Sequence, residues 1–271
     1  MALIYHYCSP NTFQQIIEHS SLWLSSTRNM NDFAEGQLLR DAVSKVLQRN
    51  QMAFGDKWCN QVWDLFLQDL KSRYITCMSE KGDILSQWRA YAQDGEGVAI
   101  GFDEEALGIR NNTIPTYDID PVKSLTLIKV NYKDFDSLEK EIEEYAITFR
   151  DASQTLEESA GLFSIYCAGL EFTIKNPAFS EEREKRIIYT PVKIPKELKL
   201  MKRHSSMSEV KFRTAGPYLV SYYAWKFSKE KCIHEIVLGP KNKFSNFDLE
   251  IFLEANDLTH IKVTKSAATY R

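Results

Sequence analysis

The chain has 271 residues, of which 44% are hydrophobic and 26% are charged. This composition is close to the average for soluble globular proteins, and it excludes a disordered, collagen-like or coiled-coil chain. Thirty-four Lys and Arg residues face thirty-seven Asp and Glu residues, which gives a net charge of -3. No global field therefore directs the protein toward nucleic acid or an anionic membrane, and any polyanion site must be a local patch.

The five cysteines are scattered along the chain, with no CxxC spacing and no His at a metal-ligand interval. This pattern predicts reduced thiols and no metal site. The N-terminus lacks the basic and apolar regions of a signal peptide. One of the longest nearly uncharged runs, residues 218–227, is far shorter than the ~20 apolar residues of a membrane helix. We therefore expect a cytoplasmic protein with no membrane partner.

The first hundred residues show strands and helices in mixed order. A strand at 4–7 leads into a helix that begins near SPNT, and a second strand follows at 22–26. Helical periodicity then covers residues 35–73. Residues 74–102 predict a strand, a short helix and, after the turn QDGEG, another strand.

The rest of the chain predicts one more long helical region and a strand-rich end. A strand at 125–132 precedes the helical pattern of 135–175, and the last hundred residues contain several strands and the helix FDLEIFLEAND. Because helices and strands do not alternate strictly, we expect an α+β fold rather than a doubly wound parallel sheet. With no repeat or linker, the prediction is a single domain, 1–271, in which segments 35–73 and 135–175 are helical and pack on the sheet.

Several common site motifs are excluded. The glycines of DGEGVAIGF lie between a predicted helix and a predicted strand, the reverse of the order in a dinucleotide-binding loop, so they predict a turn. The sequence has no GxxxxGK[ST] loop, HExxH pair or GxSxG elbow. Arg183 stands two residues before Lys185, where a PD-(D/E)xK nuclease would have an acid.

Two groups of candidate residues come from the first third of the chain. In Tyr5-His6-Tyr7, strand alternation sends His6 to the face opposite both tyrosines, and a hydrogen-bonded core histidine is the commoner meaning. Trp88 and Tyr91 share one face of a short helix, where two aromatic residues are usually core.

The third group lies in FSEEREKRIIY, where alternation would send Glu182, Glu184 and Arg186 to one side of a strand. Fixed carboxylates suit chemistry at a sugar C1, because they stabilise an oxocarbenium-like transition state. A charged surface network is the competing interpretation.

These segments resemble a known family. The chain resembles the bacterial family called domain of unknown function 2971, through YHYCS, LWLSSTRNMNDFAE, ITCMSEKGDILSQWRAYAQDGEGVAIGF, FSEEREKRIIY, HEIVLGPK and IKVTKSAATYR. The motif order is also similar to that of the ADP-ribosyltransferase superfamily. This second resemblance implies a split, largely antiparallel sheet with a helical insertion and a site built from His, an aromatic residue and Glu.

The ADP-ribosyltransferase resemblance implies that NAD is a co-substrate and that no metal is needed. It implies that His6 binds the ribose, that Tyr91 or Trp88 stacks on nicotinamide, and that Glu184 stabilises the oxocarbenium ion. Glu182 would activate the acceptor. Further cofactor-binding candidates are Ser25 in a Ser-Thr-Ser-like strand and, for the pyrophosphate, Arg28 or Arg89.

The resemblance also leads us to expect His6 and Glu184 on neighbouring strands at the mouth of one cleft, and Asn29, Asn31 and Asp32 bracing its rim. The acceptor would be a nucleic acid, which the basic stretch 193–213 could guide, or a protein. Proteins resembling this family are associated with toxin and phage-defence roles, which implies an antitoxin or regulatory partner.

A second functional class stays open. The same fold could serve as a non-catalytic module that senses a nucleotide or holds a partner, with His6 and Glu184 as buried structural groups. The geometry of Glu184 separates the two classes. A closed ion pair with Arg186 would weigh against catalysis, whereas an open cleft shared with His6 would favour it.

Overall fold

The computed structural model describes residues 2–27, 33–69, 73–113, 118, 120, 122–191 and 206–268. The chain divides into two compact units. Unit 1 contains Met1–Ser25, Tyr74–Leu127 and Glu181–Arg271, and unit 2 contains Ser26–Arg73 and Ile128–Ser180. The two helical segments predicted from the sequence form most of unit 2. That the chain behaves as a single domain, and that these segments pack on the sheet, stay predictions.

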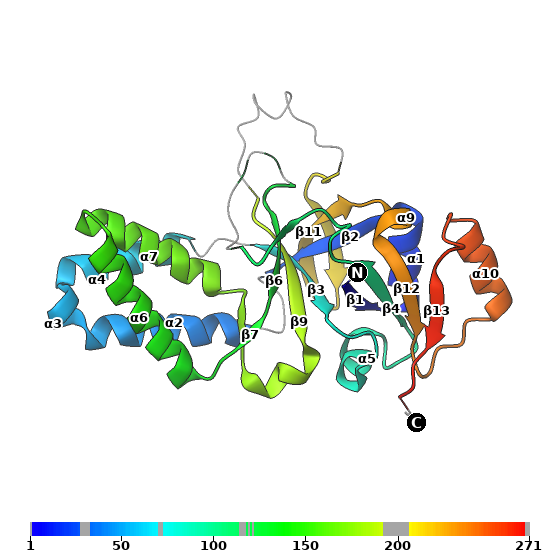
Figure 1. Cartoon of the computed structure of the whole chain (residues 1–271), viewed down its shortest axis with the longest axis horizontal. Helices are drawn as coiled ribbons and strands as arrows, with labels where there is room; N and C mark the ends of the chain where they lie inside the picture. Colours follow the sequence, from blue (N-terminus) through cyan, green and yellow to red (C-terminus); the bar gives the residue numbers. More distant parts are fainter. Residues whose placement is uncertain are drawn as a thin grey trace. The chain divides into compact units, whose positions relative to one another are not determined.

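Unit 1 holds the large sheet (Figure 1). Its strands are β1 (Leu3–Cys8), β2 (Ser21–Ser26), β3 (Tyr74–Ser79), β4 (Val98–Asp103), β5 (Arg110–Asn111), β6 (Leu125–Lys129), β9 (Glu184–Tyr189), β10 (Lys211–Ala215), β11 (Tyr218–Lys226), β12 (Ile233–Leu238) and β13 (Lys262–Lys265). Its helices are α1 (Pro10–His19), α5 (Leu85–Tyr91), α9 (Lys229–Cys232) and α10 (Asn246–Glu254). The 3₁₀ helix η2 (Pro177–Glu182) leads into β9.

The sheet branches at β3. The main strand order is β10-β11-β2-β3-β1-β4-β12-β13, while β9 pairs with both β3 and β6. The pairs β1–β4, β4–β12, β3–β9, β10–β11 and β11–β2 are antiparallel, whereas β12–β13 and β5–β6 are parallel. The α+β prediction is therefore confirmed at the level of a mixed sheet with helices.

Each face of this sheet has its own packing. On one face, Ile4, Leu22, Leu24 and Ile100 belong to the main core, which also buries the apolar side of α1. On the other face, Tyr7 packs with residues of α5, β4 and β12 in a smaller cluster. Adjacent strand positions therefore alternate between two different environments, as a pleated strand requires.

Helix α1 illustrates how local sequence sets an element. The Ser9 side chain accepts a hydrogen bond from the backbone N–H of Thr12, and Pro10 occupies the first turn, where its missing N–H costs nothing. Phe13, Ile16 and Ile17 then fall on one buried stripe. The predicted helix is confirmed, because both its cap and its periodicity are local signals.

Unit 2 is mainly helical. It contains α2 (Phe33–Arg49), α3 (Gln51–Phe54), α4 (Asp56–Asp69), α6 (Phe135–Ala152), α7 (Leu156–Leu170) and a two-stranded parallel pair, β7 (Asn131–Tyr132) and β8 (Ile174–Lys175). Its helices share a separate apolar core that includes Val43, Trp58 and Phe163. Trp58 stacks on Phe163, and its Nε1 donates a hydrogen bond to Ser159 Oγ at 2.7 Å.

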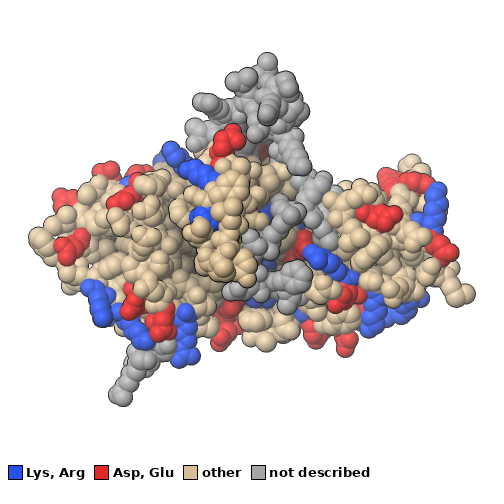
Figure 2. Space-filling model, turned by 180° about the vertical axis from the view of Figure 1, so that it is seen from behind, with Lys and Arg blue, Asp and Glu red and all other residues tan. Residues whose placement is uncertain are grey.

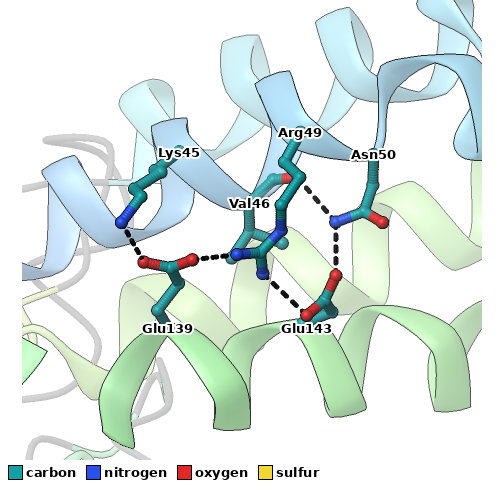
Figure 3. A network of polar contacts seen from close by, with 6 residues as sticks. All are labelled: Lys45, Val46, Arg49, Asn50, Glu139 and Glu143. Carbon is teal, nitrogen blue, oxygen red and sulfur yellow. Dashed lines mark hydrogen bonds and ion pairs between the residues drawn. The ribbon is translucent and has the colours of Figure 1, made fainter. Parts of the chain in front are cut away.

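An ion-pair network joins α2 to α6 (Figure 3). Glu139 accepts from Lys45 at 2.6 Å and also pairs with Arg49, which reaches Glu143 at 2.7 Å. Asn50 Nδ2 donates to Glu143 at 2.6 Å. The hydrogen bond from Lys45 holds the pKa of Glu139 below its usual value. The network therefore fixes the register of two helices whose apolar sides meet in the core.

Within the described residues, every helix is too short or too polar to cross a lipid bilayer.

Candidate functional site

The strand register separates the two residues that the sequence predicted to share a cleft. Tyr5 on β1 pairs with Ser79 on β3, and Ser79 also pairs with Glu184 on β9. Residues paired in register leave a sheet on the same face, so Tyr5, Ser79 and Glu184 share one face. His6, next to Tyr5, leaves on the opposite face. The expected pair on neighbouring strands is wrong, because β3 lies between β1 and β9 and the two side chains point apart.

His6 has a structural partner. Its Nδ1 lies 3.0 Å from the backbone oxygen of Cys77 on the neighbouring strand β3. Burial lowers the pKa of the imidazole, because the charged form loses its hydration. A partly buried His6 whose ring is bonded to a backbone carbonyl matches the interpretation as a hydrogen-bonded structural histidine.

Glu184 is closed off by Arg186. The guanidinium Nε lies 2.7 Å from Glu184 Oε1, and Nη2 lies 3.0 Å from Oε2. The exposed fractions of the two side chains are 6% for Glu184 and 2% for Arg186. Both carboxylate oxygens are therefore engaged in a buried bidentate pair. This is the geometry that weighs against a catalytic Glu184.

Glu182 does not alternate with Glu184 along a strand. It ends the 3₁₀ helix η2, and β9 begins only at Glu184. Between them, Arg183 has a φ of 45°, in the left-handed region, which breaks the two-residue period. The Glu182 backbone oxygen accepts a hydrogen bond from Ser79 Oγ at 2.7 Å. The prediction that Glu182 and Glu184 point to the same side assumed that both residues belong to one strand. Glu182 lies before the start of β9, so strand alternation does not apply to it.

The aromatic candidates on α5 have different surroundings. Trp88 is fully buried, meets Tyr7 edge to face with ring centroids 4.8 Å apart, and donates from Nε1 to Asp83 at 2.7 Å. A ring held in this way is core and has no free face for nicotinamide. Tyr91 and Arg89 are exposed on the same helix. Their predicted roles, like those of the catalytic carboxylates, stay predictions.

The remaining predicted residues lie partly outside the described part of the chain. This applies to Arg28, to the loop residues Asn29, Asn31 and Asp32, and to residues 193–205 of the basic stretch. Ser25 is described: its Oγ accepts a hydrogen bond from Arg213 Nη2 at 3.2 Å. Arg213 belongs to β10, and its contact with Ser25 lies on a surface that the sequence did not predict as a site.

Strands β2, β10 and β11 form a face that combines aromatic and basic side chains. In the register, Tyr222 pairs with both Lys211 and Ser25, so these residues share one face with Trp23 and Arg213, two positions away along their strands. The rings of Trp23 and Tyr222 lie 4.7 Å apart with an interplanar angle of 31°. The Arg213 Cζ lies 5.8 Å from the centroid of the Trp23 ring. We call these five residues the Trp23 face.

The Trp23 face is open to solvent. Trp23 is 36% exposed, which is high for an aromatic residue in the middle of a strand. Lys211 is exposed, and Arg213, Tyr222 and Ser25 are partly exposed. An exposed aromatic cluster with a polar rim marks an interaction surface more often than a structural one.

Among the residues that the structure describes, the basic side chains of this face and the nearby Lys226 have no acidic partner. Strands β2, β10 and β11 contain no Asp or Glu. Among the described residues, no carboxylate pairs with Lys211, Arg213 or Lys226. Elsewhere in unit 1, by contrast, Lys185 and Lys241 have carboxylate partners. Uncompensated cations next to stacked rings are suited to an anion that carries flat rings of its own.

The surface charge makes such a local arrangement informative. On the side of the molecule drawn in Figure 2, basic and acidic side chains are interspersed, and neither sign dominates. With a net charge of -3, a polyanion site must come from local composition, and strands β2, β10 and β11 contain Lys and Arg without Asp or Glu.

Trp23 and Tyr222 were not among the residues predicted from the sequence. The signal was present: in SLWLSS the tryptophan alternates with two leucines, which predicts that it points away from the core. The absence of acids from residues 211–226 was also visible. What the sequence does not show is that β2 and β11, almost two hundred residues apart, are neighbours.

A cavity of about 560 Å³ lies elsewhere in unit 1, between the first turns of α1 and α10. Phe13, Phe244 and Phe252 form its apolar lining, with Lys243 and Asp248 also at its wall. None of the residues predicted for the site lines it. Among the described residues, no group of three His, Cys, Asp or Glu side chains is placed to hold a metal ion.

Comparison with known proteins identifies a family for part of the chain. A family described as "protein of unknown function (DUF2971)" matches residues 87–187, from α5 to β9. The chain is therefore similar to that family over this segment, which is shorter than the nearly full-length resemblance predicted from the motifs. Searches of the curated proteins and of the solved structures gave no match. The resemblance to ADP-ribosyltransferases receives no support from these comparisons.

Proposed function

We propose that this protein is a non-catalytic binding module that holds nucleic acid on the Trp23 face. The observation that carries the proposal is Arg213, whose guanidinium lies over an exposed tryptophan, is bonded to Ser25, and has no carboxylate partner among the described residues. Arg has five N–H donors in a planar fork, and Ser25 engages one nitrogen. Nε is buried, so the terminal Nη nitrogens are the ones that suit a phosphate.

Charge and position support the same function. Lys211 and Lys226 add two further cations to the strands that form the Trp23 face. Phosphate contacts supply most of the affinity in sequence-independent nucleic-acid binding. A sheet surface with aromatic residues and a basic rim is also a recurrent way to hold RNA or single-stranded DNA.

The catalytic alternative, NAD-dependent ADP-ribosyl transfer, has weaker geometric support. Its proposed carboxylate, Glu184, is in a buried pair with Arg186, and its proposed ribose ligand, His6, leaves the opposite face of the sheet. Incubation of the protein with NAD labelled on adenine, with RNA, DNA or cell extract as acceptor, tests this alternative directly. Transfer of label to any acceptor, or release of nicotinamide, would restore it.

The binding function is tested by measuring affinity for labelled oligonucleotides by fluorescence anisotropy. The double variant Lys211→Gln/Arg213→Gln should weaken binding strongly, because two phosphate contacts are lost. Lys241→Gln is the matched control, since it removes one positive charge from an ion pair with Asp94, outside the Trp23 face. Equal affinity of the double variant and the wild type would overturn the proposal.

A further inference from the structure

The rings of Trp23 and Tyr222 have no role in a purely electrostatic site. Phosphates alone would need only Lys211, Arg213 and Lys226, and exposed aromatic rings cost free energy when they face water. The Trp23–Tyr222 ring pair therefore suits a ligand with flat apolar surfaces. On the basis of the proposed function, we infer that the Trp23 face binds single-stranded nucleic acid and stacks at least one unpaired base on the Trp23–Tyr222 pair.

The small residues around the rings support stacking. In the register, Trp23 on β2 is paired with Ala224 on β11, and Tyr222 on β11 is paired with Ser25 on β2. Each ring thus has a short side chain opposite it. The two rings are diagonal neighbours and contact each other above these short side chains. The Arg213 guanidinium lies over the Trp23 ring, and Trp23 still keeps 36% of its surface exposed. A base can extend the existing ring stack from the exposed side.

The positions of the cations fit a nucleic-acid strand that runs along β11. Lys211 is in register with Tyr222, and Arg213 reaches Ser25 on the far side of β11. Along β11, Arg213 is paired with Val220 before the ring pair, and Lys226 lies two positions beyond Ala224, the partner of Trp23. A backbone that passes over the rings in this direction meets positive charge before and after the stacked base.

A duplex fits this surface poorly. In a base-paired helix, the flat faces of the bases are covered by their neighbours, and only edges are accessible in the grooves. Short side chains on a sheet cannot reach those edges, and the rings would meet the sugar-phosphate backbone instead. Single strands expose their base faces, and stacking on them is tolerant of sequence.

The experiment compares an unlabelled single strand of about 12 thymidines, a length within the usual range of site sizes, with a blunt duplex of the same length. Binding is read from protein tryptophan emission, because a stacked base quenches the indole it covers, and from competition with a fluorescein-labelled strand. We expect quenching by the single strand and much weaker binding of the duplex.

Variants assign the effect to the rings. Trp23→Leu should weaken single-strand binding by roughly 5- to 150-fold, the range for loss of one stacked base, and should abolish the quenching. Trp23→Phe, which keeps an aromatic ring, should recover much of the affinity without the tryptophan signal. Phe212→Leu is the matched control, because Phe212 is exposed on β10 but lies between Lys211 and Arg213 in the alternation and therefore points to the other face.

The outcomes separate the inference from the proposed function. If the single strand and the duplex bind equally, and Trp23→Leu matches the wild type while Lys211→Gln/Arg213→Gln does not, the stacking inference is wrong and the electrostatic function stands. If neither nucleic acid binds, both are wrong. Preference for the single strand that is lost in Trp23→Leu and kept in Phe212→Leu supports both.

Discussion

Arg186 and Glu184, two residues apart on β9, bind each other through two hydrogen bonds and are almost completely buried. Their alternation on a strand puts both side chains on one face, as the sequence predicted. The consequence differs from the one expected from the acidic motif, because a carboxylate that neutralises a buried guanidinium is a structural group.

The first prediction concerns this pair. Glu184→Gln should lower the free energy of unfolding by about 3–5 kcal/mol, since it removes one charged partner of a buried bidentate pair. Urea denaturation followed by circular dichroism measures the change. The double variant Glu184→Leu/Arg186→Met should recover most of the stability, because apolar replacements of a buried pair are often neutral. A loss below about 1 kcal/mol in Glu184→Gln would mean that solvent screens the pair.

The second prediction concerns close backbone packing at Gly97. A Cβ at this position would lie 2.0 Å from the backbone oxygen of Cys8, so Gly97→Ala must displace β1 from the start of β4. We expect a loss of at least about 1–3 kcal/mol, the cost of overpacking. Gly161→Ala is the control: nothing lies near its Cβ in α7, so it should gain about 0.5–1 kcal/mol in helix stability. Thermal unfolding of the two variants should therefore shift in opposite directions.

The third prediction concerns His6 and pH. Burial lowers its pKa in the folded state, so below about pH 6.5, the pKa of an unfolded histidine, the unfolded chain binds a proton that the folded protein does not. The free energy of unfolding should then fall as pH decreases from 6.5, in the direction that linkage requires. Urea unfolding of the wild type and of His6→Asn at several pH values isolates this contribution. Parallel curves for the two proteins would contradict it.

The fourth prediction concerns salt. If Lys211, Arg213 and Lys226 each contact a phosphate, the logarithm of the association constant for a single strand should fall against the logarithm of salt concentration with a slope of about -2, at ~0.7 per contact. Lys226→Gln should reduce the slope by roughly 0.7. Titrations at a series of salt concentrations give both slopes. A slope unchanged by this substitution would remove Lys226 from the contact set.

The sequence predicted local structure well and the relative placement of the candidate site residues poorly, for physical reasons that particular residues show. Helix α1 is set by its cap and its periodicity, and strand β4 by an apolar run directly after a turn, so both predictions from local sequence succeeded. The predicted orientation of Glu182 was wrong because Arg183 has a left-handed backbone conformation, which strand alternation does not predict.

The prediction that His6 and Glu184 lie on neighbouring strands was wrong for a different reason. It depends on β3 lying between β1 and β9, and the pairing of distant strands is not written in any local pattern. The same holds for the Trp23 face, because its strands β2 and β11 come from opposite ends of the chain.

The pairing of β2 with β11 also shapes how the protein is made. β2 leaves the ribosome long before β11, because the chain builds all of unit 2 and most of unit 1 between them. At the usual pace of translation, this interval is on the order of 10–40 s. During it, the nascent chain carries an unpaired strand edge with a tryptophan exposed, which is a template for aggregation. The protein's yield in cells should therefore depend on holdase chaperones that cover this edge until the last third of the chain arrives.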